Sequence, residues 1–251
     1  MSDAAILTER RGRVLVITMN RPEAMNAINQ ALAEGLAAAV EELDVDPELT
    51  AGVLTGAGRG FCSGMDLKAF AAGEDIGAAT RFFAEGAKKP LIGAIEGFAL
   101  AGGLELALSC DLLVAAEGVK LGIPEVKVGL FAAGGGVMKL PSRVGYGKAM
   151  EMAITGDPIT AEEGKEHGLI SVITEPGGAV DAAIALAERV AGNAPLGVEA
   201  SKAIIRASQG MLEADLWEYQ KAFTRKVFTS NDAKEGPAAF AEKRAPEWSG
   251  T

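Results

Sequence analysis

Short apolar segments separated by turn residues recur along the first half of the chain, and they constrain its fold more than any other feature. Several are rich in β-branched or small side chains, which is typical of buried strands. These segments cover residues 13–19, 51–55, 91–95 and 111–115. Helical spacing follows at residues 28–43, where we predict Asn26 as the N-cap, and again from about residue 102 to 109. Strands that alternate with helices predict an α/β core.

The second half of the chain has a predominantly helical pattern. Helical segments are predicted over residues 161–167, 178–191, 196–209, 212–227 and 232–243. Pro195 is predicted to divide a core of residues 1–194 from a helical segment of residues 195–251. Such a segment packs either on a neighbouring subunit or back on its own domain. At 251 residues, one large domain with an appended segment is the expected organisation.

Charge and cysteine content exclude several classes of protein. The net charge of −10 argues against nucleic acid as a partner, because phosphate binding needs a cationic surface. Cys62 and Cys110 are too few for a disulfide framework and lack metal-ligand spacing, so we predict no metal site. No cleavable signal pattern and no apolar run near the ~20 residues of a membrane span are visible. We therefore expect a soluble, cytoplasmic protein that does not bind membranes.

Two glutamates lie in apolar, glycine-rich surroundings, Glu105 in ALAGGLE and Glu125 in LGIPE. A carboxylate among apolar neighbours is costly unless it is paired or used. Glu105 falls in the first turn of its predicted helix, so it either complements the helix dipole or acts on a ligand at the exposed N–H groups of Gly102 and Gly103. Glu125 follows Pro124 and is either an ordinary loop residue or a second acid. If both face one cleft, they could serve as general acid and general base.

Other common catalytic patterns are weak or absent. His167 is the single histidine and lies in a polar segment, which makes a serine–histidine–aspartate site improbable. The glycines at 56, 58 and 60 lack the spacing of a dinucleotide-binding loop. The following segment, GFCSGMDL at residues 60–67, exposes N–H groups where a strand passes into a helix. Residues 67–88 are predicted as an irregular helical element that lines a site.

Six motifs together resemble the crotonase (enoyl-CoA hydratase/isomerase) superfamily. They are NRP with the following NA at 20–27, GRGFCSGMDL at 58–67, GFALAGGLELALSCDLLVA at 97–115, LGIPEVKVGL at 121–130, TGDPITAEEGKEHGLI at 155–170 and EGPAAFAEKRAPEW at 235–248. They span essentially the whole chain in the order and spacing of that family. The resemblance implies a crotonase-like spiral of ββα units, with the active site in residues 1–194 and a helical C-terminal trimerisation segment.

The resemblance also implies the reaction and the residues that perform it. In this family two backbone N–H groups bind the thioester oxygen, and their matching positions here are Met65 and Gly102. Its hydratases use two glutamates, which match Glu105 and Glu125. In the implied reaction Glu105 activates water for attack on the β-carbon of a 2-enoyl-CoA thioester, and Glu125 delivers a proton to the α-carbon. Such an enzyme belongs to fatty acid and lipid metabolism.

Coenzyme A is expected as part of the substrate, and no further cofactor is implied. Positions matching the family's substrate and coenzyme A contacts are Ser63, Asp66, Lys68, Phe240 and Lys243. The last two lie in a region that in some relatives reaches the site of a neighbouring subunit. A lysine that some relatives place after NRP is Glu23 here, and Met65 replaces a common alanine. The family's assembly predicts a homotrimer or a dimer of trimers.

Several alternatives remain open from the sequence. A carnitinyl-CoA dehydratase-like enzyme fits the C-terminal EGPAAFAEKRAPEW segment, and an enoyl-CoA isomerase would use a single glutamate. A non-catalytic acyl-CoA-binding or RNA-binding paralogue is a different class of protein. The intact pair of glutamates argues against a silent acyl-CoA-binding protein, and the charge of −10 argues against RNA binding.

Overall fold

A six-stranded sheet with strand order β1–β2–β3–β4–β6–β9 forms the centre of the protein. In the computed structural model, which describes residues 4–251, β1 is antiparallel to β2 and the other neighbours are parallel. The strands are β1 (Ile6–Arg11), β2 (Val14–Met19), β3 (Ala51–Gly56), β4 (Leu91–Ile95), β6 (Leu112–Ala116) and β9 (Val172–Thr174). The predicted strands are confirmed to within a residue, and so is the α/β class.

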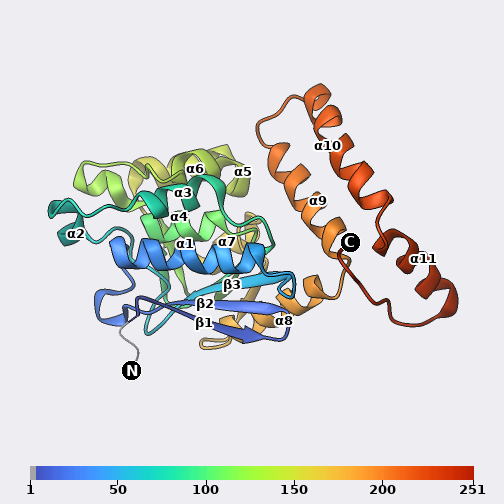
Figure 1. Cartoon of the computed structure of the whole chain (residues 1–251). Helices are drawn as coiled ribbons and strands as arrows, with labels where there is room; N and C mark the ends of the chain where they lie inside the picture. The colour runs from blue at the N-terminus through green and yellow to red at the C-terminus, as the bar shows by residue number, and fades with distance from the viewer. Residues whose placement is uncertain (1–3) are drawn as a thin grey trace.

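Side chains of the sheet alternate between two hydrophobic layers. In β2, Leu15 and Ile17 belong to the main core, whereas Val14 and Val16 face the other way. The main core also holds α1 (Gln30–Val45), and the second layer holds α8 (Ala179–Ala191), which cover opposite faces of the sheet (Figure 1). A strand buried on both faces needs apolar residues throughout, which explains the continuous apolar sequence of β2.

A small second sheet carries the elements that lead to the two glutamates. It consists of β5 (Phe98–Leu100), β7 (Lys120–Gly122) and β8 (Ile159–Thr160), in that order. β5 and β7 are parallel, so both chains leave the sheet at the same edge. β5 leads into α4 (Gly102–Ser109), which holds Glu105, and β7 leads into the 3₁₀ helix η2 (Pro124–Val128), which holds Glu125.

The remaining helices agree with most of the predicted segments. They are η1 (Pro22–Ala24), α2 (Leu67–Ala71), α3 (Gly77–Glu85), α5 (Gly136–Val144), α6 (Tyr146–Thr155), α7 (Ala161–Glu166), α9 (Pro195–Ala207), α10 (Glu213–Phe228) and α11 (Asp232–Glu242). The irregular element expected over residues 67–88 is two short helices that Gly73, at φ +72°, helps to separate. Helices α5 and α6 were not predicted.

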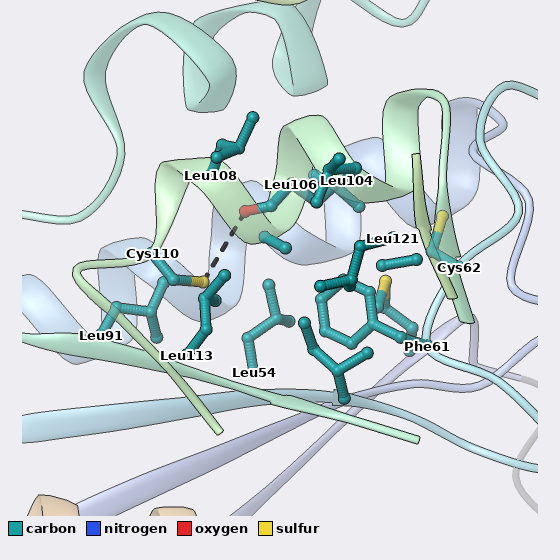
Figure 2. Close-up of a cluster of buried hydrophobic side chains, with 14 of the residues drawn as sticks. Leu54, Phe61, Cys62, Leu91, Leu104, Leu106, Leu108, Cys110, Leu113 and Leu121 are labelled. Atoms are coloured by element: carbon teal, nitrogen blue, oxygen red, sulfur yellow. Dashed lines mark hydrogen bonds between the residues drawn. The ribbon is translucent and has the colours of Figure 1, made fainter. Parts of the chain in front are cut away.

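Helix α4 lies within the main core with all eight of its residues buried. Figure 2 shows Leu104, Leu106 and Leu108 on this helix, above side chains that rise from the sheet strands. At its end the Cys110 thiol donates to the carbonyl of Leu106 at 3.6 Å. A helix without a solvent-facing side is rigidly held, which suits an element that must present catalytic groups.

The C-terminal helices α9, α10 and α11 stand apart from the sheet and its covering helices (Figure 1). Helix α9 is tethered by Lys202, whose ammonium donates to Asp111 at 2.6 Å and to the carbonyl of Lys89 at 2.7 Å. Helix α10 buries none of its residues. The division at Pro195 stays a prediction. Within residues 4–251, no helix is long and apolar enough to span a membrane.

The prediction that Asn26 caps the first long helix is wrong. Helix α1 begins at Gln30, and its N-cap is Asn29, which accepts from the N–H of Leu32 at 3.0 Å. Asn26 is fully buried at φ +54°. Its side chain accepts from the N–H of Arg21 at 2.9 Å and donates to the carbonyls of Ala57 and Gly60 at 2.9 and 3.0 Å. Asn26 therefore joins two loops.

Replacing these two asparagines by alanine should affect stability unequally. Asn26→Ala leaves three backbone groups, one of them fully buried, without this partner and places alanine at positive φ, so we expect a loss of about 2–4 kcal/mol in the free energy of unfolding. Asn29→Ala removes one capping bond and should cost about 1 kcal/mol. Urea unfolding at fixed protein concentration measures both values, and equal losses would contradict the assignment of Asn26 as the loop-joining residue.

Candidate active site

Among the described residues, the N–H groups of Met65 and Gly102 donate to no protein acceptor where the loop around Met65 meets the start of α4. Ile28 pairs with the residues on either side of Met65, accepting from Asp66 at 2.9 Å and donating to the carbonyl of Gly64 at 2.8 Å. Within the described residues, the N–H of Met65 donates to no protein acceptor. The extended pairing therefore holds this group in place while leaving it available to a ligand.

The second free donor is the N–H of Gly102, the first residue of α4. The preceding residue, Ala101, adopts φ 51° and ψ −130°, a conformation rarely occupied by a residue with a side chain. Its own N–H is fixed by the carbonyl of Gly122 at 2.9 Å. A Cβ atom built on Gly102 would lie 3.6 Å from the nitrogen of Met65, so the two donors lie side by side.

Two glycines allow this close approach. A Cβ atom on Gly103 would lie 2.2 Å from the carbonyl oxygen of Cys62, and one on Gly64, at φ +104°, would lie 2.7 Å from the Cβ of Ala101. The carbonyl of Cys62 also accepts from the N–H of Leu100 at 3.0 Å. Any larger residue at these positions would push the loop and the helix apart. The geometry fits an oxyanion hole.

Glu105 is buried one turn further along α4 and is held by the turn before α5. Its exposed fraction is 4%, and its Oε1 accepts from the N–H of Gly136 at 2.9 Å. Burial raises the pKa of Glu105 above its ordinary value, against the N–H groups of Gly136 and Gly134 and the positive charge of Lys139. The carboxylate is thus fixed in orientation, and its pKa is shifted in the direction that suits a base working near neutral pH.

Glu125 lies in η2, in the electrostatic reach of Glu105. Among residues 4–251 its Oε2 atom is shielded from solvent and has no hydrogen-bond partner. Burial raises the pKa of Glu125, and the negative charge of Glu105 raises it further, against its own backbone N–H. A buried, unpartnered carboxyl oxygen beside another carboxylate favours the protonated form. The structure therefore brings the two predicted glutamates into one site.

Other predicted substrate contacts divide into two groups. The first group lies in or beside the Met65 loop and consists of Ser63, Asp66 and Lys68. Asp66 caps α2 by accepting from the N–H groups of Lys68 and Ala69. Lys68 is exposed. Phe240, with an exposed fraction of 87%, and Lys243 lie at the end of α11, which stands far from α4 (Figure 1). The structure does not bring these two residues to the glutamates of the same chain.

Two residues that support the site were not found from the sequence. The guanidinium of Arg21 donates to Asp66 at 3.0 Å and also to the carbonyl of Ala27, which ties the NRP segment to the Met65 loop. Lys139 on α5 lies behind Glu105. Nothing in the local pattern around Lys139 separates it from an ordinary helix lysine. Among residues 4–251 no cluster of three or more histidine, cysteine or acidic side chains could hold a metal ion.

Comparisons with known proteins identify the family of the chain. The profile of the enoyl-CoA hydratase/isomerase family matches residues 9–251. Enoyl-CoA hydratase EchA19 of Mycobacterium tuberculosis is 41% identical over 96% of this chain and 95% of its own. Carnitinyl-CoA dehydratase of Proteus mirabilis is 38% identical over both full lengths. The crystal structure of an enoyl-CoA hydratase from Mycobacterium tuberculosis H37Rv has a TM-score of 0.95 at 52% identity, covering 99% of this chain and 100% of that one.

The profile match covers nearly the whole chain, and in the structure the charge of Glu105, in the first turn of α4, acts on Glu125. The chain belongs to the enoyl-CoA hydratase/isomerase (crotonase) family and is an enoyl-CoA hydratase, a hydro-lyase, within it.

Proposed function

We propose that this enoyl-CoA hydratase adds water to a 2-enoyl-CoA thioester with Glu105 as the general base and Glu125 as the general acid. The N–H groups of Met65 and Gly102 would bind the thioester oxygen. The observation that carries the proposal is that the charge of the buried Glu105 acts on the half-buried Glu125, while the N–H groups of Met65 and Gly102 lie side by side at the start of the helix that carries Glu105. Coenzyme A enters as part of the substrate.

The two donors would stabilise the enolate that forms when water attacks the β-carbon. Negative charge then moves onto the thioester oxygen, which two fixed N–H groups bind more strongly than the neutral carbonyl. The N-terminal end of α4 adds its partial positive charge at Gly102. A donor of this kind contributes roughly 3–4 kcal/mol to transition-state stabilisation.

The surroundings of the carboxyls support the division of roles. Glu105 accepts from the N–H of Gly136, which stabilises its ionised form and prepares it to remove a proton from water. Glu125 has an unpartnered Oε2, which favours the protonated form that can give a proton to the α-carbon. After one turnover Glu105 holds the proton and Glu125 has lost one, and exchange with solvent restores the pair. The pair then titrates as a unit.

Apolar side chains near the Met65 loop support an uncharged acyl group as substrate. Leu67 and Phe70, on the helix that follows the loop, have exposed fractions of 60% and 59%. We propose an uncharged enoyl chain in preference to the charged crotonobetainyl group of a carnitinyl-CoA dehydratase. A panel of enoyl-CoA esters that includes crotonobetainyl-CoA tests this preference, and selective turnover of the charged ester would contradict it.

Substitution of either glutamate should abolish most of the hydration activity. Glu105→Gln and Glu125→Gln keep the shape of the side chain but cannot exchange the proton, so kcat for crotonyl-CoA should fall by roughly 10²–10⁴-fold. The double variant should lose little more than either single variant, because the two groups act as one unit. Loss of enoyl absorbance measures the rate.

Glu188→Gln on α8 provides the control for removing a surface negative charge. It should retain the activity of the unaltered protein. Full activity of Glu105→Gln and Glu125→Gln would show that the assigned acid and base are wrong, even though the protein is a hydratase.

A methyl group on Gly103 should disrupt the oxyanion hole. Gly103→Ala places a Cβ atom against the carbonyl of Cys62, which must move together with the loop that carries Met65. We expect kcat to fall by roughly 10²–10³-fold, the cost of losing one donor. Gly147→Ala is the matched control, because it is also the second residue of a helix and its Cβ would meet no atom within 4 Å. Equal activity of the two variants would contradict the donor assignment.

The C-terminal helices support the proposal of a homotrimer or a dimer of trimers. Helix α10 has no buried residue, yet Trp217 and Phe228 are apolar and have exposed fractions of 61% and 78%. Large apolar side chains gathered on exposed helices mark surfaces that a partner covers. In such an assembly Phe240 and Lys243 would contact coenzyme A bound to a neighbouring subunit, since they lie far from their own site.

Phe228→Ser should weaken this assembly. The change removes an apolar contact without adding charge, so the mass measured by light scattering after gel filtration should fall towards that of one chain. Lys226→Ser is the control, because Lys226 lies about 200° around α10 from Phe228 and therefore on the other face of the helix. If Phe228→Ser leaves an assembled protein intact, or if the unaltered protein is a monomer, α10 is not the interface.

A further inference from the structure

A buried chain of hydrogen bonds links Lys139 to the backbone of Glu105. The ammonium of Lys139 donates to the hydroxyl of Ser109 at 2.9 Å, and this hydroxyl donates to the carbonyl of Glu105 at 2.9 Å. Ser109 has an exposed fraction of 2%. Ser109 follows Glu105 by four residues on α4, so the connection reaches the same face of the helix one turn beyond Glu105 and acts on the position of that residue.

Lys139 also joins the helices that surround Glu105. Its ammonium donates to the carbonyl of Phe83 at the end of α3. The ring of Phe83 lies against Gly134, where an added Cβ atom would come within 2.7 Å of both the ring and the Oε2 of Glu105. One lysine on α5 therefore connects α3, α4 and the glycine turn that holds the carboxylate.

The charges around Lys139 leave Glu105 as a counter-charge. Arg143 and Arg206 repel it, and each donates to backbone carbonyls, Arg143 to Cys110 and Asp111 and Arg206 to Ala87. Glu105 acts in the opposite direction and favours the charged amine, whereas burial raises the pKa of the Cys110 thiol to about 12 and keeps it neutral. Lys202 lies in the same region but pairs with Asp111 at 2.6 Å. The group of α3 that accepts from the Lys139 ammonium is the carbonyl of Phe83, which is uncharged.

A charge in this environment is unfavourable for folding. Burial, followed by repulsion from Arg206, lowers the pKa of Lys139 to about 8. A pKa below the ordinary value of a lysine means that the protonated amine is less stable in the folded chain than in the unfolded one. Such shifts concentrate at functional sites, and Lys139 lies beside one.

We propose that Lys139 is a positioning residue for hydration: it fixes Glu105 through Ser109 and Phe83, and its charge keeps the Glu105 carboxylate ionised. This inference rests on the proposed role of Glu105 as the base. Because a nearby positive charge lowers the pKa of a carboxyl, loss of that charge raises the pH below which the base is protonated. Both bonds of the Lys139 ammonium are made to protein groups, Ser109 and the carbonyl of Phe83, so we expect kcat to change while KM does not.

The test is the pH dependence of kcat/KM for crotonyl-CoA in a set of Lys139 variants. Lys139→Met, which removes the charge and both bonds, should lower kcat about ten-fold and move the acidic limb upwards by about 0.5–1 pH unit. Lys139→Arg keeps the charge, so the acidic limb of its pH profile should lie at the same pH as in the unaltered protein. Ser109→Ala breaks the link but retains the charge, so it should lower kcat without moving the limb.

Lys165→Met is the matched control. Lys165 is an exposed helix lysine that also donates to a backbone carbonyl, that of Ser171, away from Glu105. It should leave both kcat and the pH profile unchanged. Thermal melting of each variant at fixed concentration separates loss of fold from loss of positioning.

Two outcomes distinguish this inference from the function on which it rests. If Glu105→Gln is inactive but Lys139→Met has an unmoved acidic limb, the role of Lys139 is overturned and the base stands. If Glu105→Gln is fully active, the proposed base is itself wrong. An equal shift in Lys139→Met and Lys139→Arg would also overturn the inference, because the charge would then not be the cause.

Discussion

The close contact between the Met65 loop and the start of α4 is the constraint on which the rest of the site depends. It exists because Gly64 and Gly103 lack side chains, and because the strand-like pairing of Cys62 with Ala99 holds the two backbones together. The unusual backbone of Ala101 is maintained by the same contact. A strained backbone conformation persists only where the surrounding structure holds it in place. Here the burial of all of α4 holds Ala101 in that conformation.

The two glutamates follow from the same construction. Since β5 and β7 are parallel neighbours, the chains that leave them enter α4 and η2 at one edge of the small sheet. Glu105 and Glu125 therefore meet although the sequence separates them by twenty residues. Burial raises the pKa of both, and only Glu105 receives N–H donors from the glycine turn. Both pKa values are therefore raised, and hydrogen bonds from the glycine turn oppose the rise only at Glu105.

Much of the fold and of the candidate site could be predicted, because the informative signals are local. Apolar runs identified the main strands, and the motifs around Glu105 and Glu125 identified the carboxyls. Asn26 was misassigned because an asparagine before a helix is usually a cap, whereas its buried bonds to Ala57 and Gly60 depend on residues far along the chain. The small sheet was missed because its strands are two or three residues long. Lys139 was missed because its partners are all distant in sequence.

Buried cations connect the C-terminal helix α9 and helix α5 to the residues at the end of α4. Lys202 binds Asp111 at the start of β6, and Arg143 donates to the carbonyls of Cys110 and Asp111 from α5. Cys110 ends the helix that carries Glu105. The residues that end α4 are thus held by Lys202 from α9 and by Arg143 from α5. Because buried charges are costly to separate, these contacts tie the end of the helix that carries Glu105 to a helix outside the core.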